Sequence, residues 1–201
     1  MSRLLLSILA SSTLALVSQP ASAQDIGGGV EVLQSTDGQT VATATYNWRS
    51  GKLDGFGFVD VFPNGGPLDF LTSHTVNYEI DGPVFASAEI GATNFGQTVR
   101  AGVGVNLPVP GMRFTRVTAY PFVQGDGDRR QVKVTWMSED LRISDDVSVY
   151  TTGFARFRDG APDVAQPQFL VKIDDVPVEF GAEVGFFGSQ TSVSAMIRMS
   201  F

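Results

Sequence analysis

The sequence predicts an all-β protein: a transmembrane, antiparallel, up-and-down β-barrel of about twelve strands, with about ten as the alternative count. Segments of roughly ten residues alternate apolar and polar side chains, the period of a β-strand with two different faces. Gly, Asp, Asn and Pro separate these segments, as expected of turns. Charged residues make up only 17% of the chain, below the ~25% of average soluble proteins, and this favours a barrel in lipid over a soluble sandwich.

The beginning of the chain has the composition of a signal peptide. Arg3 precedes an apolar run over 4–17, and small residues at Ala21 and Ala23 form a cleavage site after Ala23. We therefore expect a removed leader over 1–23 and a barrel domain over 24–201. The apolar run falls short of the ~20 residues of a transmembrane helix, and no later segment approaches that length, so a helical membrane protein is not expected.

The bulk composition argues against several classes of partner and cofactor. The 21 acidic residues outnumber the 14 Lys and Arg residues, which disfavours nucleic acid as a partner because phosphate binding needs a basic surface. The chain contains no cysteine and one histidine, so we expect neither disulfides nor a thiolate metal site, and no cofactor. A closed sheet would stabilise such an exported protein without cross-links.

The alternation also predicts where the strands lie. The first hairpin joins residues 30–35 and 40–49 around Asp37-Gly38, a strong turn signal. Residues 141–144 and 147–158 are either one strand interrupted near Asp145-Asp146 or a strand preceded by a turn, and we favour the interrupted strand. The turns include 64–67 and the loop 125–128. The other expected strands are 53–62, 70–80, 84–93, 97–107, 113–124, 129–137, 165–173, 178–187 and 191–201. The count falls from about twelve to about ten if the first hairpin or 113–124 does not span.

The last strand is expected to close the cylinder. Residues 193–201 alternate strictly and end on Phe201, a pattern that resembles the assembly signal of outer-membrane β-barrels. This strand should pair with 30–35 on one side and with 178–187 on the other. Arg198 would then face the lumen beside the strand that carries Glu179 and Glu183.

A hydrolytic site is the less favoured hypothesis. His74 is the single histidine, and Ser73 or Ser87 with Glu89 would complete a nucleophile, base and acid set. Adjacent strand residues point to opposite faces, so Ser73 and His74 do not enter one site without a bulge. We interpret His74 as a residue near a barrel rim and expect no enzymatic activity.

Residues 53–62 carry the most informative candidate pore lining. Phe56, Phe58 and Phe62 share a face with Asp60. If this face turns to the lumen, the rings would stack on a nucleobase and the carboxylate would accept hydrogen bonds from ribose hydroxyls. If it turns to lipid, Asp60 lies at an interface, and parity alone leaves both arrangements open. The other charges expected in the lumen are Glu79, Glu89, Arg100, Lys133, Arg156, Lys172, Glu179, Glu183 and Arg198.

Four short motifs resemble the Tsx-like nucleoside-specific channel family of outer-membrane proteins. They are GFGFVDVF at 55–62, GFARF at 153–157, QPQFL at 166–170 and GAEV at 181–184. The resemblance implies a monomeric channel of about twelve strands with a narrow pore for nucleosides. The chain departs from the family at Arg156, where an acidic residue is usual. The motif positions carried over are Phe56, Phe58, Asp60, Phe154 and Glu183.

The sequence therefore predicts a passive channel of the bacterial outer membrane for small polar solutes, nucleosides in particular. It would contact outer-membrane lipid, act as a monomer, bind no nucleic acid and need no cofactor. The alternatives are an outer-membrane lipid hydrolase and a closed structural or adhesion barrel. The residues expected to contact solute in the lumen are Phe56, Phe58, Asp60, Glu89, Arg100, Phe154, Arg156 and Glu183.

Overall fold

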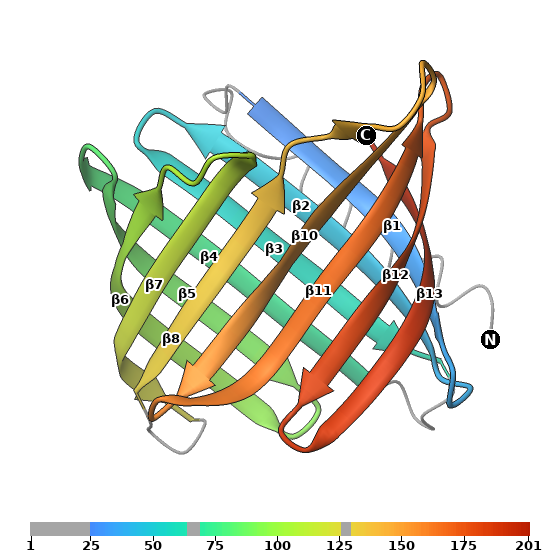
Figure 1. The fold of residues 1–201 in the computed structure, drawn as a ribbon. Coiled ribbons are helices and arrows are strands. Elements are labelled where there is room, and N and C mark those ends of the chain that lie inside the picture. The colour runs from blue at the N-terminus through green and yellow to red at the C-terminus, as the bar shows by residue number, and fades with distance from the viewer. Residues whose placement is uncertain (1–24, 64–68, 126–129) are drawn as a thin grey trace.

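The computed structural model describes residues 25–63, 69–125 and 130–201, which form one antiparallel β-barrel (Figure 1). The expected leader over 1–23 with its cleavage after Ala23, the turn at 64–67 and residues 126–128 of the expected loop lie outside the described residues. Within the described ranges, the chain forms no helix long and apolar enough to cross a membrane.

The described residues contain thirteen strands, and each long strand pairs with its neighbour in chain order. The strands are β1 (Asp25–Ser35), β2 (Thr40–Ser50), β3 (Leu53–Phe62), β4 (Asp69–Asp81), β5 (Val84–Thr93), β6 (Gly96–Leu107), β7 (Met112–Gln124), β8 (Gln131–Ser138), β9 (Leu141–Arg142), β10 (Val147–Arg158), β11 (Ala161–Ile173), β12 (Val178–Phe187) and β13 (Gln190–Ser200). Because β9 has two residues, twelve strands make the wall, and the prediction of a twelve-stranded up-and-down barrel is confirmed.

One predicted strand was wrong. Leu141 pairs with Val149 and Arg142 with Ser148 in antiparallel register, so β9 runs opposite to β10. The residues around Asp145-Asp146 therefore reverse the chain instead of interrupting one strand. β9 continues the direction of β8 after a two-residue break, and β8 and β9 together occupy one position in the wall.

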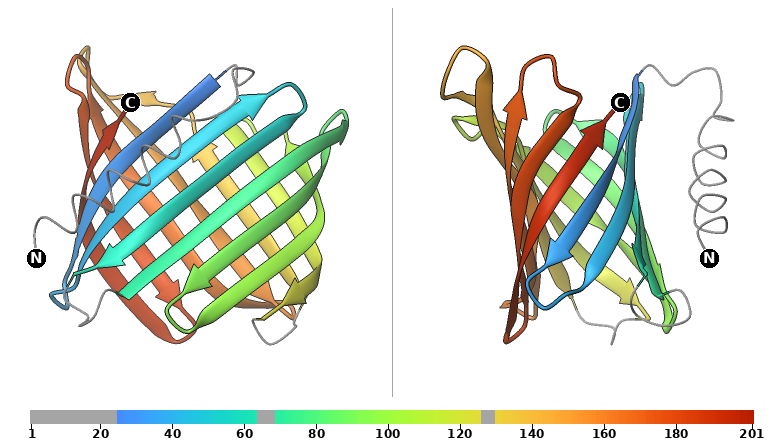
Figure 2. Two further views of the ribbon diagram at one scale, coloured as in Figure 1. Left: turned by 180° about the vertical axis from the view of Figure 1, so that it is seen from behind. Right: turned by 90° about the vertical axis from the view of Figure 1, so that its right-hand side faces the viewer.

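The terminal strand closes the barrel as predicted (Figure 2). Glu31 of β1 pairs with Arg198 of β13, and on the other side of β13 Glu179 pairs with Arg198. The backbones of Gly28 and Phe201 exchange two hydrogen bonds of 2.9 and 3.0 Å. A Cβ at position 28 would lie 2.9 Å from the Thr45 carbonyl oxygen and 3.0 Å from the Phe201 ring, so a side chain there would crowd the closing strand.

The distribution of side chains is the reverse of that in a soluble protein. On the outward faces, apolar residues such as Ile90 and Ile197 are about half exposed, at 52% and 54%. On the inward faces, polar and charged residues are nearly inaccessible, Glu89 and Arg100 each at 5%. Charged residues are rarely this buried unless they are paired, and exposed apolar belts suit a barrel surrounded by lipid.

Candidate lumen and solute-binding residues

A cross-barrel ion pair establishes which face of β3 points inward. The two guanidinium nitrogens of Arg116 on β7 donate to Asp54 on β3 at 3.0 and 3.2 Å. Three strands separate β3 from β7 in the wall, so this contact runs through the interior. Phe56, Phe58 and Asp60 lie two, four and six residues after Asp54 on the same strand, so their side chains also face the lumen.

The aromatic pair on β3 is accessible from inside the barrel. The rings of Phe56 and Phe58 lie 6.3 Å apart between centroids, with 48° between their planes. Phe56 remains 46% exposed even though it faces inward, so its ring presents free surface to the lumen. Asp60 accepts a hydrogen bond of 2.6 Å from the Thr43 hydroxyl of the neighbouring strand. The structure thus brings the three candidate residues of β3 onto one stretch of the lumen wall.

Glu89 on β5 is the centre of a buried ionic cluster. Its two carboxylate oxygens accept from Arg100 and from Lys133, each at 2.7 Å. Arg100 donates a further bond of 2.8 Å from Nε to Gln131. The Lys133 ammonium also lies 5.5 Å from the centre of the Phe154 ring, within the range of a cation–π contact. Four of these side chains come from four different strands, β5, β6, β8 and β10.

A second cluster lies beside the first, around Asp163 on β11. Its Oδ2 accepts from Arg156 at 2.7 Å and from Arg158 at 3.1 Å. The β10–β11 register shifts between Arg156 and Phe157, so that Arg156 faces Val164 and Phe157 faces Pro162. Asp163 is the extra residue of this bulge, which gives its carboxylate access to both guanidinium groups.

The third cluster joins the two ends of the chain around Arg198. Its guanidinium donates to Glu31 at 2.7 Å and to Gln168 of β11 at 2.5 Å. Gln168 in turn donates to Glu183 at 2.8 Å. Arg198 lies beside the strand that carries Glu179 and Glu183, as predicted, with Glu179 directly opposite in register. Its ion-pair partner is Glu31, and Glu179 accepts a hydrogen bond from the Tyr150 hydroxyl.

Part of the lumen is filled by apolar side chains, which the sequence did not predict. Leu33, Leu170 and Met196 form a cluster in which Leu170 is 1% exposed, and Val41 and Tyr150 pack against it. These residues have the same parity as the charged residues on their strands, so they face inward. The interior is therefore a mixture of ion pairs and apolar packing.

Several lumen residues were missed from the sequence. Asp54 lies on the same face of β3 as Asp60. Glu31 pairs with Thr43, which in turn pairs with Asp60, so Glu31 also lies on that face. The register of the first two hairpins therefore indicated both residues. Asp163 depends on a bulge, for which an alternating pattern gives no indication. The others missed are Arg116, Tyr120, Gln131, Tyr150, Arg158 and Gln168.

His74 lies on the outer face in the middle of β4, so the prediction that it lies near a rim was wrong. Its ring nitrogens are 2.7 Å from the Tyr46 hydroxyl and 2.6 Å from the Thr72 hydroxyl. Ser87, in contrast, faces inward, 3.3 Å from the Tyr120 hydroxyl. The residues considered for a lipid hydrolase are thus divided between the two faces of the wall, with His74 outside and Ser87 and Glu89 inside. The Glu89 carboxylate is also paired with two cations.

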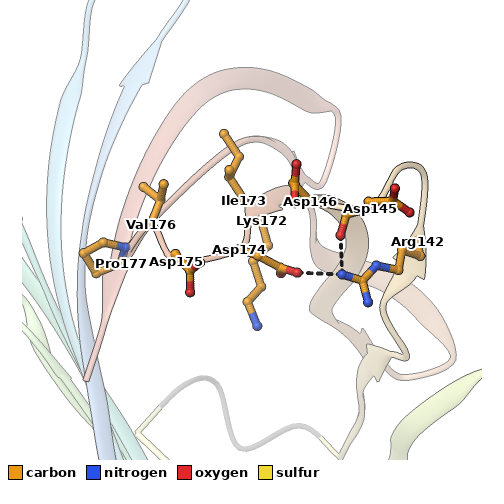
Figure 3. A pocket seen from close by; sticks show the side chains of 9 residues that line it. All are labelled: Arg142, Asp145, Asp146, Lys172, Ile173, Asp174, Asp175, Val176 and Pro177. Atoms are coloured by element: carbon orange, nitrogen blue, oxygen red, sulfur yellow. Dashed lines mark hydrogen bonds and ion pairs between the residues drawn. The ribbon is translucent and has the colours of Figure 1, made fainter.

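Two turns border an open pocket at the barrel end that carries the C-terminus (Figure 3). Its volume is about 640 Å³, and it lies between the β9–β10 and β11–β12 turns. Arg142 donates to the Asp174 carboxylate at 2.7 Å and to the Asp145 carbonyl, which ties one turn to the other. In the described parts of the chain, no group of three or more His, Cys, Asp or Glu side chains is arranged to hold a metal ion.

A closed antiparallel barrel of twelve spanning strands with an ion-paired interior defines the fold class of the outer-membrane porins. No protein-family model matches the chain, and no curated protein sequence matches it. Among solved structures, it is similar to the KdgM porin in complex with disordered oligogalacturonate, at 10% identity and a TM-score of 0.57, over 87% of this chain and 99% of that chain.

Two further structures give the same result. The KdgM porin by itself matches with a TM-score of 0.56 at 10% identity, over 87% of this chain and 99% of that one. The outer membrane protein Omp33 of Acinetobacter baumannii matches with a TM-score of 0.52 at 10% identity, over 90% of this chain and 99% of that chain. At this level of identity the likeness concerns the fold, and nucleoside specificity is not part of it.

Proposed function

We propose that this protein is a channel of the bacterial outer membrane through which small polar solutes diffuse passively. The observation that carries the proposal is the inverted burial, with apolar side chains around the outside of a closed barrel and ion pairs inside it. Lipid offers the backbone no hydrogen-bond partners, and a closed sheet satisfies every strand edge. We infer a monomer in contact with outer-membrane lipid, since one chain completes the cylinder.

Passage would occur by weak, repeated contacts along the lumen. Polar groups stand at successive levels: Asp54 and Arg116 near the β2–β3 turn, Glu89 midway, and Asp163 with Arg158 near the β10–β11 turn. A solute would exchange its bonds to water for bonds to these groups, strongly enough to enter and weakly enough to leave. Neither an energy source nor a cofactor enters this mechanism.

The test is single-channel recording in planar bilayers with the purified, refolded protein. We expect discrete conductance steps in potassium chloride, and swelling of proteoliposomes in small sugars. The folded state is checked independently by the strand signal in circular dichroism and by heat-dependent migration in gels. A folded barrel that passes neither ions nor sugars would overturn the proposal.

Within this class we propose nucleosides as the preferred solute. The support is the accessible Phe56–Phe58 pair next to Asp60 on the lumen face of β3. A nucleobase stacks on aromatic rings with about 1–3 kcal/mol per base, and a carboxylate accepts from ribose hydroxyls. The remaining candidates Glu89, Arg100, Phe154, Arg156 and Glu183 would line the rest of the path.

Adenosine should therefore reduce the potassium current in a concentration-dependent way. Phe56→Leu should weaken this block about tenfold, and Asp60→Asn about threefold, since each removes one contact. Phe180→Leu is the matched control, because Phe180 is an exposed phenylalanine on the outer face. Equal block in the wild type, Phe56→Leu and Asp60→Asn would refute the nucleoside assignment and leave the channel intact.

A closed structural barrel is the second candidate, and one observation favours it. Inward residues from several strands are almost completely buried, including Leu170 at 1% and Tyr120 and Gln131 at 2% exposure. Such packing would obstruct a wide pore. The bilayer recording separates the two candidates, because a structural barrel would insert and fold without conducting.

A further inference from the structure

Two side chains form a bar across part of the barrel mouth. Arg116 lies on β7 and Asp54 on β3, and β4, β5 and β6 stand between these two strands in the wall. Both terminal nitrogens of the guanidinium donate to the carboxylate, one to each oxygen. Asp54 pairs with Arg49, and Arg49 pairs with Asp25 at the start of β1, so the contact lies at the barrel end that carries the C-terminus. We call the Arg116 and Asp54 pair the cross-bar.

The cross-bar is supported by each of the three strands that it passes. The Arg116 guanidinium carbon lies 4.6 Å from the centre of the Phe85 ring on β5, in cation–π contact. Glycine at position 104 makes room for this ring, because a Cβ there would lie 2.1 Å from it. On β6, Asn106 accepts from Nε of the arginine at 3.0 Å. On β4, Asn77 donates to the carboxylate end of the bar at 2.7 Å. The geometry of the bar is therefore held by the wall beneath it.

The space next to the cross-bar on this side is small. A cavity of about 90 Å³ is lined by both residues of the cross-bar and by Glu79, Phe85 and Asn106, among others. This is room for roughly three water molecules at their volume in the liquid, and too little for a sugar. A larger solute therefore has to pass on the other side of the cross-bar.

The cross-bar stays in contact with water, unlike the ionic cluster around Glu89. The side chains of Arg116 and Asp54 are 26% and 37% exposed, whereas those of Lys133 and Glu89 are 18% and 6% exposed. The Glu89–Lys133 pair also passes two strands of the wall, β6 and β7, where the cross-bar passes three. Accessible side chains that reach this far across a mouth are met by a solute that enters there. Ion pairs with this exposure add little to stability, so variants of the cross-bar should fold.

We infer that the cross-bar is a constriction that limits the size of the solutes passing this mouth of the barrel. Its two side chains bind each other and the wall, so they obstruct a passing solute more than they attract one. The effect is steric, and it should act on uncharged solutes and grow with solute size. The inference rests on the proposed channel function, and it is independent of the nucleoside assignment.

The first test measures swelling of proteoliposomes in neutral sugars of increasing size: arabinose, maltose and raffinose. Arg116→Ala removes the long arm of the cross-bar and should speed raffinose entry about threefold, with a smaller gain for maltose and almost none for arabinose. Asp54→Ala releases the arm without removing it and should speed raffinose entry about twofold. Equal raffinose rates in the wild type and both variants would overturn the inference and leave the channel function standing.

The two variants also separate a steric effect from an electrostatic one. They change the charge of the mouth in opposite directions, so a rise in neutral-sugar entry for both has a steric cause. Arg113→Ala is the matched control, three residues earlier on β7, where Arg113 pairs with Asp140 at 2.7 Å. Asp140 lies between β8 and β9, in the neighbouring position of the wall, so this ion pair does not cross the mouth. The control should match the wild type, and opposite changes in Arg116→Ala and Asp54→Ala would overturn the inference.

A reversible cross-link gives a second measurement within one barrel. The chain contains no cysteine, so Asp54→Cys with Arg116→Cys introduces the only two thiols. This variant should pass raffinose faster than the wild type, joining its thiols with bis-methanethiosulfonate reagents of graded length should restore the slower rate, and dithiothreitol should reverse the effect. A cross-linked barrel that passes raffinose as fast as the reduced one would overturn the inference. A folded barrel that passes no sugar, as wild type and in every variant, would overturn the channel function together with the inference.

Discussion

Two polar clusters lie back to back on the wall, separated by the thickness of one sheet. The inner cluster is Glu89 with Arg100 and Lys133, and the outer cluster is His74 with Tyr46 and Thr72. The two clusters are centred one residue apart along the β4–β5 pair, because His74 pairs with Ile90 and the next residue, Thr75, pairs with Glu89. The inner cluster is held by full charges, whereas the outer one consists of two hydroxyls around an imidazole.

The difference follows from what each face meets. Inside, a charge finds an opposite charge and polar neighbours, so carboxylate and guanidinium groups persist at 5% exposure. Outside, an unpaired charge would face apolar surroundings, and only a side chain that meets all its hydrogen bonds locally is tolerated. A neutral imidazole has one donor and one acceptor, and the two hydroxyls satisfy both.

The largest expected effect comes from removing the inner carboxylate. Glu89→Gln leaves the buried Arg100 and Lys133 without a counter-charge, and such a loss costs about 3 kcal/mol or more. The free energy of unfolding, measured by urea titration in lipid vesicles, should fall by about that amount. Glu139→Gln, at an exposed position in the break between β8 and β9, should change it by less than about 0.5 kcal/mol. An unchanged urea midpoint for Glu89→Gln would mean that the inner cluster does not depend on its charges.

The next effect distinguishes the two faces by their glycines. A Cβ at Gly102, on the inner face, would lie 1.9 Å from the backbone oxygen of Ala119, which does not move easily. A Cβ at Gly55, on the outer face, would meet the Trp48 ring at 2.1 Å, and that side chain can turn away. Gly102→Ala should therefore cost about 2–3 kcal/mol and Gly55→Ala about 1 kcal/mol in the same urea titration. The reverse order would show that Trp48 is held more firmly than the β7 backbone.

How far the sequence predicts this molecule depends on the range of each interaction. The alternation of each strand and the hairpin signal at Asp37-Gly38 are local, and they led to the closed twelve-stranded wall. The reversal at Asp145-Asp146 was misjudged because two short alternating runs look alike whether the chain continues or turns back.

The lumen contacts were less accessible from sequence, since they join distant residues. The Glu31–Arg198 pair spans 167 positions, and nothing in either local pattern designates the other partner. The alternation along each strand identified Glu89, Arg100 and Glu183 as inward. It does not tell whether an inward side chain joins an ionic cluster, packs against apolar neighbours or remains accessible in the lumen. Leu33 and Phe56 are both inward and apolar, and only the fold separates the packed residue from the accessible one.

The smallest effect tests the outer cluster alone. Tyr46→Phe removes the hydroxyl that lies 2.7 Å from His74 Nδ1 while keeping the ring that packs over Gly57. One neutral hydrogen bond contributes about 1 kcal/mol, so the free energy of unfolding should fall by about that amount. Thr72→Val should act similarly, and the double variant should cost less than the two single losses added together, because both hydroxyls act on one imidazole. Strict additivity would indicate that the two bonds are independent. Permeation should be unchanged in all three variants, since the cluster lies on the face away from the lumen.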